Sequence, residues 1–273
     1  MKRSGIKIVY FAVFILIIFL GVRGIMRGSG ASIETKEKIV VLDEPKALPE
    51  NEDKLVMFSG QLSSEDKLEF KEFGINVETP ILERKVEVYQ YYDDYRINQI
   101  RKGWRSDDPE PTVTDKDKKV YYNIEKSIDD DIIYGKANLG DFEIDQEILR
   151  KINPNKFVDN LENYENYRVI DEKYLTNAKD DVFKIGDLRL SFKYLDIENA
   201  GEITLVGKQS LNKLVDYKLD TGKVLLEKYD GKITLDELVL RLDKEEQMSK
   251  YSLILGIIIM LPIGYLIFRS KSN

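Results

Sequence analysis

The sequence predicts an α+β fold in which a strand-dominated, antiparallel soluble domain is flanked by two transmembrane α-helices. Two long apolar runs predict the helices: residues 9–22 read VYFAVFILIIFLGV, and residues 253–268 read LILGIIIMLPIGYLIF. With their flanks, both runs reach the roughly 20 apolar residues that a helix needs to cross about 30 Å of hydrocarbon. Several segments between them alternate polar and apolar residues with period two, which predicts the strands of a half-buried sheet.

The charges beside the apolar runs predict a two-pass protein of the cell membrane. Basic residues precede the first run and follow the second, so both termini are expected in the cytoplasm, although two arginines just after the first run oppose this orientation. A cleaved signal peptide is the alternative interpretation of the first run, but no small-x-small cleavage site directly follows it. The predicted segments are a cytoplasmic N-terminus at 1–7, transmembrane helices at 8–27 and 251–268, an extracytoplasmic domain at 28–250, and a cytoplasmic tail at 269–273.

The distribution of charge restricts the possible partners. All 49 acidic residues lie at positions 34–246, whereas seven of the 42 basic residues lie in or beside the apolar runs. The central region therefore carries a formal charge of −14. This charge argues against nucleic acid as a partner, because phosphate contacts need clustered lysine and arginine. It also argues against the domain lying on an anionic lipid surface.

The chain contains neither cysteine nor histidine. Disulfides, thiol nucleophiles, Ser-His-Asp triads and zinc sites with cysteine or histidine ligands are therefore excluded. Carboxylates, lysine, tyrosine and serine remain available for chemistry. We predict that the protein is not an enzyme and that it binds no cofactor.

The first half of the central domain predicts few regular elements. A polar linker is expected at 29–38, and a strand at 54–59. Residues 86–92 (VEVYQYY) alternate as a half-buried strand does. The polar residues 98–119, which contain the one tryptophan of the chain, predict a long exposed loop, and a short strand is expected at 120–124.

The second half is more regular. Residues 188–194 alternate cleanly, and Asp220-Thr-Gly222 is a typical hairpin signal with glycine at a left-handed position. Thr234 and Glu237 form a capping box at the start of a helix that runs towards the second apolar run. The predicted helices before it are 145–152 and 155–164, and the predicted strands are 188–194, 202–208, 215–219 and 224–229.

Several strings of residues carry a family resemblance. Residues 51–60 read NEDKLVMFSG and residues 82–91 read LERKVEVYQY. These strings resemble the start of the transmembrane protein 43 domain and its Leu-Arg-Arg-x-Val-Glu-Met-Tyr-Gln-Trp motif. A His-x-Asn-Pro segment of the family is missing after Trp104. Further matches in family order lie at 104–105, 137–144, 185–192, 203–209 and 234–242.

The resemblance implies a membrane protein with an extracytoplasmic or lumenal domain. In animals the family is linked to the inner nuclear membrane and endoplasmic reticulum, where it organises membrane protein complexes. This chain resembles a shorter, prokaryotic-type member. We expect a non-enzymatic scaffold whose partners are other membrane or envelope proteins and the lipid bilayer, with homo-oligomerisation as an open option. The alternative is a lipid-binding or lipid-sensing protein at the outer leaflet, with an apolar groove near residues 91–104 or beside the helix from Thr234.

The candidate contact residues for a partner or lipid are Tyr89, Tyr91, Tyr92, Trp104, Asp187 and Arg189. The four aromatic residues form an amphipathic stretch, and such rings suit surfaces that are half in water. The two charged residues could pair with charged groups of a partner. The structural alternatives stay open: the tyrosines could simply pack on a sheet, and the Gly-Asp-Leu-Arg string could only turn the chain into a strand.

Two acidic groups are weaker candidates. Three consecutive carboxylates at 129–131 could bind Ca²⁺ or Mg²⁺, but they lack the spacing of an EF-hand loop. Glu87 with Asp93 and Asp94 could form a glycosidase pair, which needs two carboxylates roughly 5–10 Å apart. A chain with 49 acidic residues produces such groups by chance, so we predict no catalytic residue and no metal site.

Overall fold

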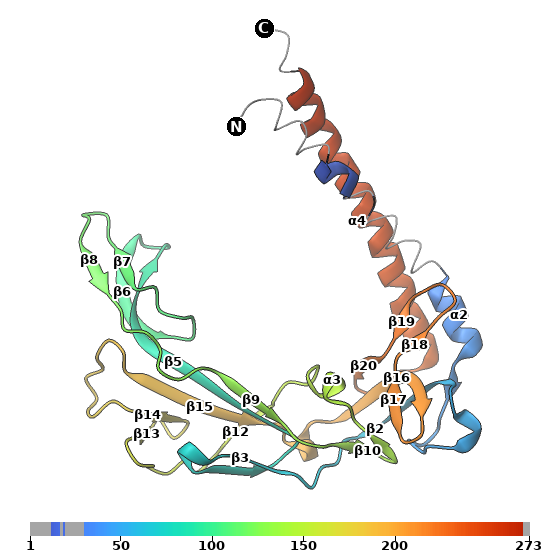
Figure 1. The fold of residues 1–273 in the computed structure, drawn as a ribbon, viewed down its shortest axis with the longest axis horizontal. Coiled ribbons are helices and arrows are strands. Elements are labelled where there is room, and N and C mark those ends of the chain that lie inside the picture. Colours follow the sequence, from blue (N-terminus) through green and yellow to red (C-terminus); the bar gives the residue numbers. More distant parts are fainter. Residues whose placement is uncertain (1–11, 17–18, 20–29, 270–273) are drawn as a thin grey trace. The chain divides into compact units, whose positions relative to one another are not determined.

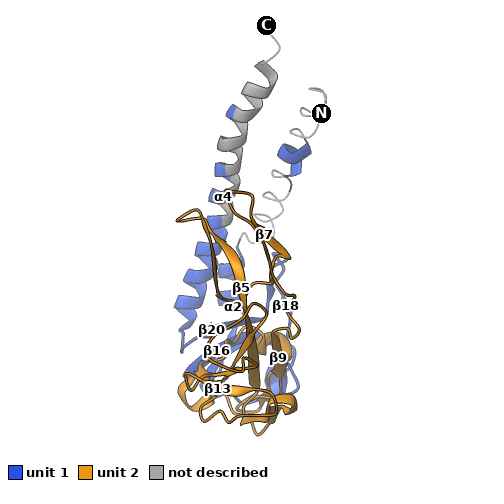
Figure 2. Ribbon diagram, turned by 90° about the vertical axis from the view of Figure 1, so that its left-hand side faces the viewer, with its two compact units in different colours: residues 1–60, 202–273 blue, residues 61–201 orange. Residues whose placement is uncertain are grey.

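The computed structural model describes residues 12–16, 19 and 30–269 (Figure 1). Two compact units divide the chain: unit 1 comprises residues 1–60 and 202–273, and unit 2 comprises residues 61–201 (Figure 2). Strands outnumber helices in both units and most strand pairs are antiparallel, which confirms this part of the predicted fold class. The predicted bounds of the central domain, 28–250, are set by the two predicted membrane spans and stay a prediction.

A small sheet forms the centre of unit 1. Its strands are β1 (Val40–Val41), β2 (Leu55–Gln61), β16 (Glu202–Ser210), β17 (Lys213–Val215) and β20 (Glu227–Asp230). β16 lies between β2 and β17 and also pairs with β20, and β1 pairs in parallel with β2. The predicted hairpin is present as β18 (Tyr217–Lys218) and β19 (Val224–Leu225). Its turn contains Gly222 at a φ of +85°, as the left-handed position requires.

Two helices pack on each other in unit 1: α2 (Ala31–Lys38) and α4 (Leu235–Arg269). The expected linker at 29–38 is wrong, since most of it is α2. The capping box is confirmed, because the Thr234 amide donates to Glu237 Oε2 at 2.7 Å and the Glu237 amide donates to Thr234 Oγ1 at 3.2 Å. α4 buries Leu238 and Leu242 against the unit 1 core. That core also contains Ala31, Leu55, Met57, Val206, Leu219, Leu225 and Ile233.

The first predicted span, 8–27, lies outside the described residues except for 12–16 and 19. The second, 251–268, is the C-terminal part of α4, which contains Pro262 and continues past Ser249. In the described part of the chain, no helix is both long enough and apolar enough to cross a membrane.

Glu34 fixes α2 to the turn of the β18–β19 hairpin. Its carboxylate accepts hydrogen bonds from the backbone amides of Asp220 at 2.6 Å and Thr221 at 3.0 Å, and from Lys38 Nζ at 2.8 Å. Burial alone would raise the pKa of this carboxyl, but the hydrogen bonds outweigh burial and lower the pKa from 4.5 to about 2. The folded state therefore keeps Glu34 ionised well below the pH at which the unfolded chain binds a proton.

Glu34→Gln is expected to lower stability at neutral pH by about 1–2 kcal/mol, because it replaces charge-assisted hydrogen bonds by weaker ones. Since the folded pKa is lowered, the stabilisation by the carboxylate is complete above about pH 4.5 and is lost as the pH falls towards about 2. Thermal unfolding of the full chain in detergent should therefore depend less on pH in this window for the variant. Glu37→Gln, an exposed neighbour on α2, is the control. Equal pH profiles for Glu34→Gln and the unchanged chain would contradict the assignment.

Unit 2 is built on a seven-stranded antiparallel sheet. Its strand order is β13-β14-β15-β5-β6, with β12 also on β15 and β9 also on β5. The members are β5 (Ile81–Asp94), β6 (Gln99–Arg105), β9 (Asp131–Tyr134), β12 (Lys156–Phe157), β13 (Arg168–Ile170), β14 (Tyr174–Thr176) and β15 (Leu188–Tyr194). Smaller elements of unit 2 are β3 (Lys67–Phe70), β4 (Ile75–Glu78), β7 (Thr112–Thr114), β8 (Val120–Tyr122), β10 (Asn138–Leu139), β11 (Phe142–Glu143) and α3 (Gln146–Leu149).

The central strand of this sheet is β5, which is 14 residues long. It pairs with β15 from Leu82 to Val88 and with β6 from Val88 to Asp94. Side chains satisfy the strand where neighbouring strands end. Asp130 Oδ1 accepts from the Val86 amide at 2.8 Å, and Asn123 bonds both the amide and the carbonyl of Tyr91 at 2.7 and 2.9 Å. These side chains replace a partner strand at both open stretches of β5.

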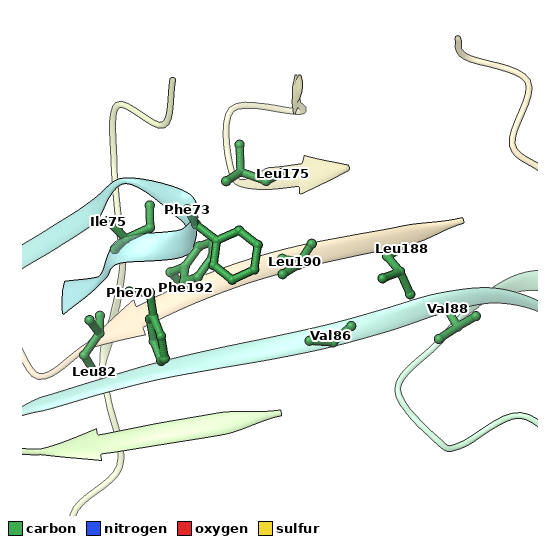
Figure 3. Packing of buried hydrophobic residues seen from close by; sticks show 10 residues of the cluster. All are labelled: Phe70, Phe73, Ile75, Leu82, Val86, Val88, Leu175, Leu188, Leu190 and Phe192. Atoms are coloured by element: carbon green, nitrogen blue, oxygen red, sulfur yellow. The ribbon is translucent and has the colours of Figure 1, made fainter. Parts of the chain in front are cut away.

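The core of unit 2 lies on one face of β5 and β15. Figure 3 shows side chains of both strands there, with residues of the β3–β4 hairpin packed over them. Phe192 contacts Phe70 and Phe73, with ring centroids 5.8 and 5.6 Å apart. Arg84 lies on the same face, over both of these rings at 4.9 and 5.5 Å, and its guanidinium donates to Glu72 at 2.7 Å. The remaining members of the core are Ile75, Leu82, Val86, Val88, Leu175, Leu188 and Leu190.

Two predicted elements of unit 2 are wrong and two are close. The expected loop at 98–119 instead contains β6 and β7. Cationic side chains of β6 stack on aromatic rings, so this strand is stabilised without the buried apolar face that an alternating sequence would reveal. The expected helix at 155–164 is absent, since Asn155 exchanges hydrogen bonds with Asp196 and the next residues pair with β15. The helix expected at 145–152 shortens to α3, and the strand at 188–194 agrees with β15.

Candidate functional site

The outer face of β5, opposite the core, carries the candidate aromatic residues. Val86, Val88 and Gln90 are buried, whereas Tyr89 and Tyr91 alternate with them and are half-buried. This confirms the predicted alternation. Register then places Trp104 of β6 directly opposite Tyr89, and Arg189 of β15 opposite Glu87, on the same outer face.

Four aromatic side chains and one arginine form a contiguous patch there, which we call the aromatic face: Tyr89, Trp104, Tyr174, Phe183 and Arg189. The Trp104 ring lies 5.3 Å from Tyr89 and 4.9 Å from Phe183, and both contacts are edge-to-face. Tyr89 and Phe183 lie 5.8 Å apart. Such pairs are the preferred geometry of aromatic contacts, so the rings hold each other in place while all of them stay partly exposed.

Arg189 lies between two rings of the aromatic face. Its guanidinium carbon is 5.1 Å from the Trp104 centroid and 4.4 Å from the Tyr174 centroid. Its Nε donates to Glu87 Oε2 at 2.6 Å across the β5–β15 pair. Stacking and the ion pair together fix the cation, so the aromatic face presents a planar, ordered charge rather than a flexible one.

The remaining candidates lie outside the aromatic face. Tyr91 contacts the Tyr121 ring at 5.0 Å, beside Asn123. Tyr92 points to the opposite side of β5, where the Arg105 guanidinium lies 4.9 Å from its ring. The sequence pattern therefore grouped Tyr92 with Tyr89 and Tyr91, although side chains alternate along β5 and Tyr92 lies on the opposite face.

Asp187 has a structural place in the turn before β15. Its carboxylate accepts from the Lys184 amide at 2.6 Å, and its carbonyl accepts from the Tyr89 amide at 2.8 Å. Gly186 has a φ of +94° and its amide donates to the Tyr89 carbonyl at 2.9 Å. The turn therefore forms two backbone hydrogen bonds with Tyr89, in the position where a neighbouring strand would pair with β5.

The weaker acidic candidates face cations of the chain itself. The hydrogen bonds of the Val86 amide and Lys85 lower the pKa of Asp130, although burial opposes them, and Arg84 lies near Asp131 at 3.8 Å. Glu87 is held by Arg189. Within the described residues no group of three acidic side chains is arranged to hold a metal ion.

Three of the hollows formed by the described residues each lie within one unit. One of about 510 Å³ lies between α2 and α4 in unit 1, with apolar walls at Ile33 and Val239 and charged residues at its rim. Another of about 510 Å³ lies at the end of the β5–β6 hairpin, lined mainly by charged side chains and tyrosines. The largest, about 780 Å³, is polar and contains Lys156, whose Nζ is 3.3 Å from Asp196. The first of these three lies beside the helix from Thr234, where an apolar groove is expected for the lipid-binding alternative.

Sequence reasoning missed Tyr174 and Phe183. Tyr174 is in a three-residue strand and Phe183 is in an irregular segment, so no periodicity places either on a face. The only signal is that Phe183 is a large ring in a polar stretch, KDDVFK, where an aromatic residue needs a packing partner.

Phe183→Ala is expected to expose Trp104, because it removes the ring that packs 4.9 Å from the indole. The chain has no other tryptophan, so fluorescence reports this site alone. We expect red-shifted emission, stronger quenching by acrylamide, and stability lowered by about 1–2 kcal/mol. Tyr122→Ala removes an exposed ring of unit 2 and should leave the spectrum unchanged. Unchanged emission in Phe183→Ala would refute the packing.

Comparison with known proteins gives one consistent family. A family model described as Transmembrane protein 43 matches residues 98–271, more than half of the chain. Transmembrane protein 43 of Rattus norvegicus is 23% identical over 295 residues, which cover 92% of this chain and 70% of the rat protein. No solved structure matches. The matched region contains Trp104, Phe183 and Arg189 of the aromatic face.

Proposed function

Because the chain belongs to the transmembrane protein 43 family, we propose that it is a membrane-anchored, non-enzymatic scaffold that organises or stabilises membrane protein complexes. The observation that carries this proposal is the aromatic face. Tyrosine, tryptophan, phenylalanine and arginine are the residues enriched in protein interfaces and in their energetic hot spots. Here they are ordered by mutual stacking, so a partner meets a preorganised surface and loses little side-chain entropy on binding.

The proposed anchors are transmembrane helices at 8–27 and 251–268, with both termini in the cytoplasm. The apolar runs and their basic flanks support this topology. The absence of native cysteine allows a direct test. Ser106→Cys, at an exposed position after β6, should react with a membrane-impermeant thiol reagent in intact cells. Ser272→Cys, in the predicted cytoplasmic tail, should react only after lysis, and the reverse pattern would overturn the topology.

The scaffold proposal is tested by crosslinking the tagged full chain in cells, followed by purification in detergent and proteomics. We expect a membrane protein in stoichiometric amount, which is lost in Trp104→Ala because the central ring of the aromatic face is gone. Tyr122→Ala, which removes an exposed ring outside this face, should retain the partner. Circular dichroism of both variants checks that folding is preserved. A partner that both folded variants retain would exclude the aromatic face as its binding surface.

The hollow between α2 and α4 favours a second candidate function, lipid binding or lipid sensing at the outer leaflet. Its apolar wall at Ile33 and Val239 suits part of an acyl chain. Val239→Trp would fill the hollow and should remove a lipid that copurifies with the full chain. Leu240→Trp, on the exposed side of α4, is the matched control. A lipid retained equally by both variants would reject this site.

A further inference from the structure

The turn that joins β5 to β6, residues 95–98, exposes large apolar side chains. Tyr95 is 86% exposed, more than any other large hydrophobic side chain in the described part of the chain, and Ile97 is 44% exposed. Hairpin turns normally carry glycine, asparagine, aspartate or serine, so tyrosine and isoleucine at the two positions need a reason. Neither side chain contributes to the cores of the described residues.

The backbone of this turn is fixed, so the exposed side chains are held outward. Asp94 Oδ1 accepts from the Arg96 amide at 3.2 Å, and the Asp94 carbonyl accepts from the Ile97 amide at 3.1 Å. Asn98 takes a left-handed conformation with φ of +51°, which asparagine tolerates. The turn therefore displays Tyr95, Arg96 and Ile97 on a convex, ordered end of the hairpin.

Cations surround these apolar side chains. Residues 92–105 contain four basic and two acidic residues, in a chain whose formal charge is −7. Arg96 has no ion-pair partner among the described residues, and Arg101 lies 3.6 Å from Asp94 with its side chain 56% exposed. The hollow of about 510 Å³ at this end of the hairpin is lined by three arginines, two tyrosines and two aspartates: Arg96, Arg101, Arg105, Tyr92, Tyr95, Asp93 and Asp94. Arg105 is paired with Asp107 at 2.8 Å, so Arg96 is the arginine of this tip that has no ion-pair partner in the described part of the chain. An exposed guanidinium without a carboxylate partner favours an anionic, phosphate-bearing partner.

We propose that the hairpin tip, residues 95–97, docks on the surface of a bilayer that contains anionic phospholipid. Tyr95 and Ile97 would enter the headgroup region, where amphipathic and apolar side chains gain from partial burial, and Arg96 would pair with a lipid phosphate.

The overall acidic charge of the central domain does not oppose this local contact. Charges farther than about 8–10 Å from the surface are largely screened at physiological ionic strength, so the contact depends on the charges of the tip itself, where Arg96 has no ion-pair partner among the described residues. The inference goes beyond the proposed scaffold function, because two terminal anchors alone would hold a scaffold without any lipid contact by its domain.

The test uses the full chain with one introduced cysteine. Ile97→Cys, labelled with an environment-sensitive fluorophore, is reconstituted into vesicles of phosphatidylcholine and phosphatidylglycerol in equal amounts. Insertion into the bilayer should shift the emission of this fluorophore to the blue, and spin-labelled lipid should quench it. Val182→Cys, 74% exposed in the same unit, carries the label in the control and should show neither effect. Equal quenching at both positions would overturn the proposal.

A second comparison isolates the charge of the tip. Arg96→Gln, combined with the labelled Ile97→Cys, should lose most of the quenching, whereas Arg96→Lys should retain it. In vesicles of phosphatidylcholine alone, the labelled Ile97→Cys should also lose most of the quenching. Quenching that depends neither on the arginine nor on the anionic lipid would refute the proposed recognition. No partner protein is present in these vesicles, so the result is independent of whether the scaffold proposal succeeds.

Discussion

Phe192→Ala is expected to lower the free energy of unfolding of unit 2 by about 3–5 kcal/mol. Phe192 is 1% exposed, and its ring fills the space between Phe70 and Phe73 over the central strands. Alanine would lose both ring contacts and leave a cavity beside the stacked guanidinium of Arg84. Denaturant unfolding of the full chain in detergent, followed by the fluorescence of Trp104, measures unit 2 because this tryptophan belongs to it.

The control for this variant is Tyr122→Ala, which removes a ring that is 71% exposed. It should change stability by no more than about 0.5 kcal/mol. If Phe192→Ala cost as little as this control, the three-ring cluster could not be the centre of the core.

Gly186→Ala is expected to destabilise unit 2 by about 2–5 kcal/mol, the sum of two separate costs. The φ of +94° disfavours any side chain by about 1–2 kcal/mol. An added Cβ would also lie 2.8 Å from Ile124 Cδ1 and 3.0 Å from its Cβ, so Ile124 or the turn must shift, at a further cost of about 1–3 kcal/mol. The same fluorescence-detected unfolding measures the sum.

Gly201→Ala separates these two costs. Gly201 also has a positive φ, +74°, but an added Cβ would meet nothing within 4 Å. Gly201→Ala should therefore lower the free energy of unfolding by only about 1–2 kcal/mol. Equal losses at the two glycines would mean that the close approach of Ile124 carries no energetic weight.

The sequence predicts best those elements whose pattern comes from one buried face. β15 agrees with its prediction because Leu188, Leu190 and Phe192 all face one core. β6 was not predicted, because it is an edge strand of the sheet and does not alternate buried apolar with exposed polar side chains. Its arginine, lysine and tryptophan side chains stack on neighbouring rings instead. α2 escaped because its anchor, the bonds of Glu34 to the turn at Asp220, joins residues 186 positions apart.

For the candidate site, the sequence could predict the residue types but not how they group. Tyr89, Trp104 and Arg189 come together because two strand registers place them on one face. Tyr92 has the same chemistry and lies on the other face, because neighbouring side chains of a strand alternate. Asp187, chosen for its charge, holds its own turn. Register and turn contacts depend on long-range pairing, which a local pattern does not contain.

The continuity of β5 has a consequence for how unit 2 opens. This one strand pairs with β9 and β15 at its first half and with β6 at its second, and the side chains of Asp130 and Asn123 close its remaining gaps. Its amides cannot be released in one half without loosening the sheet in the other. In hydrogen exchange, β5 should therefore behave as the slowest cooperative unit, while the short peripheral hairpins exchange by local opening.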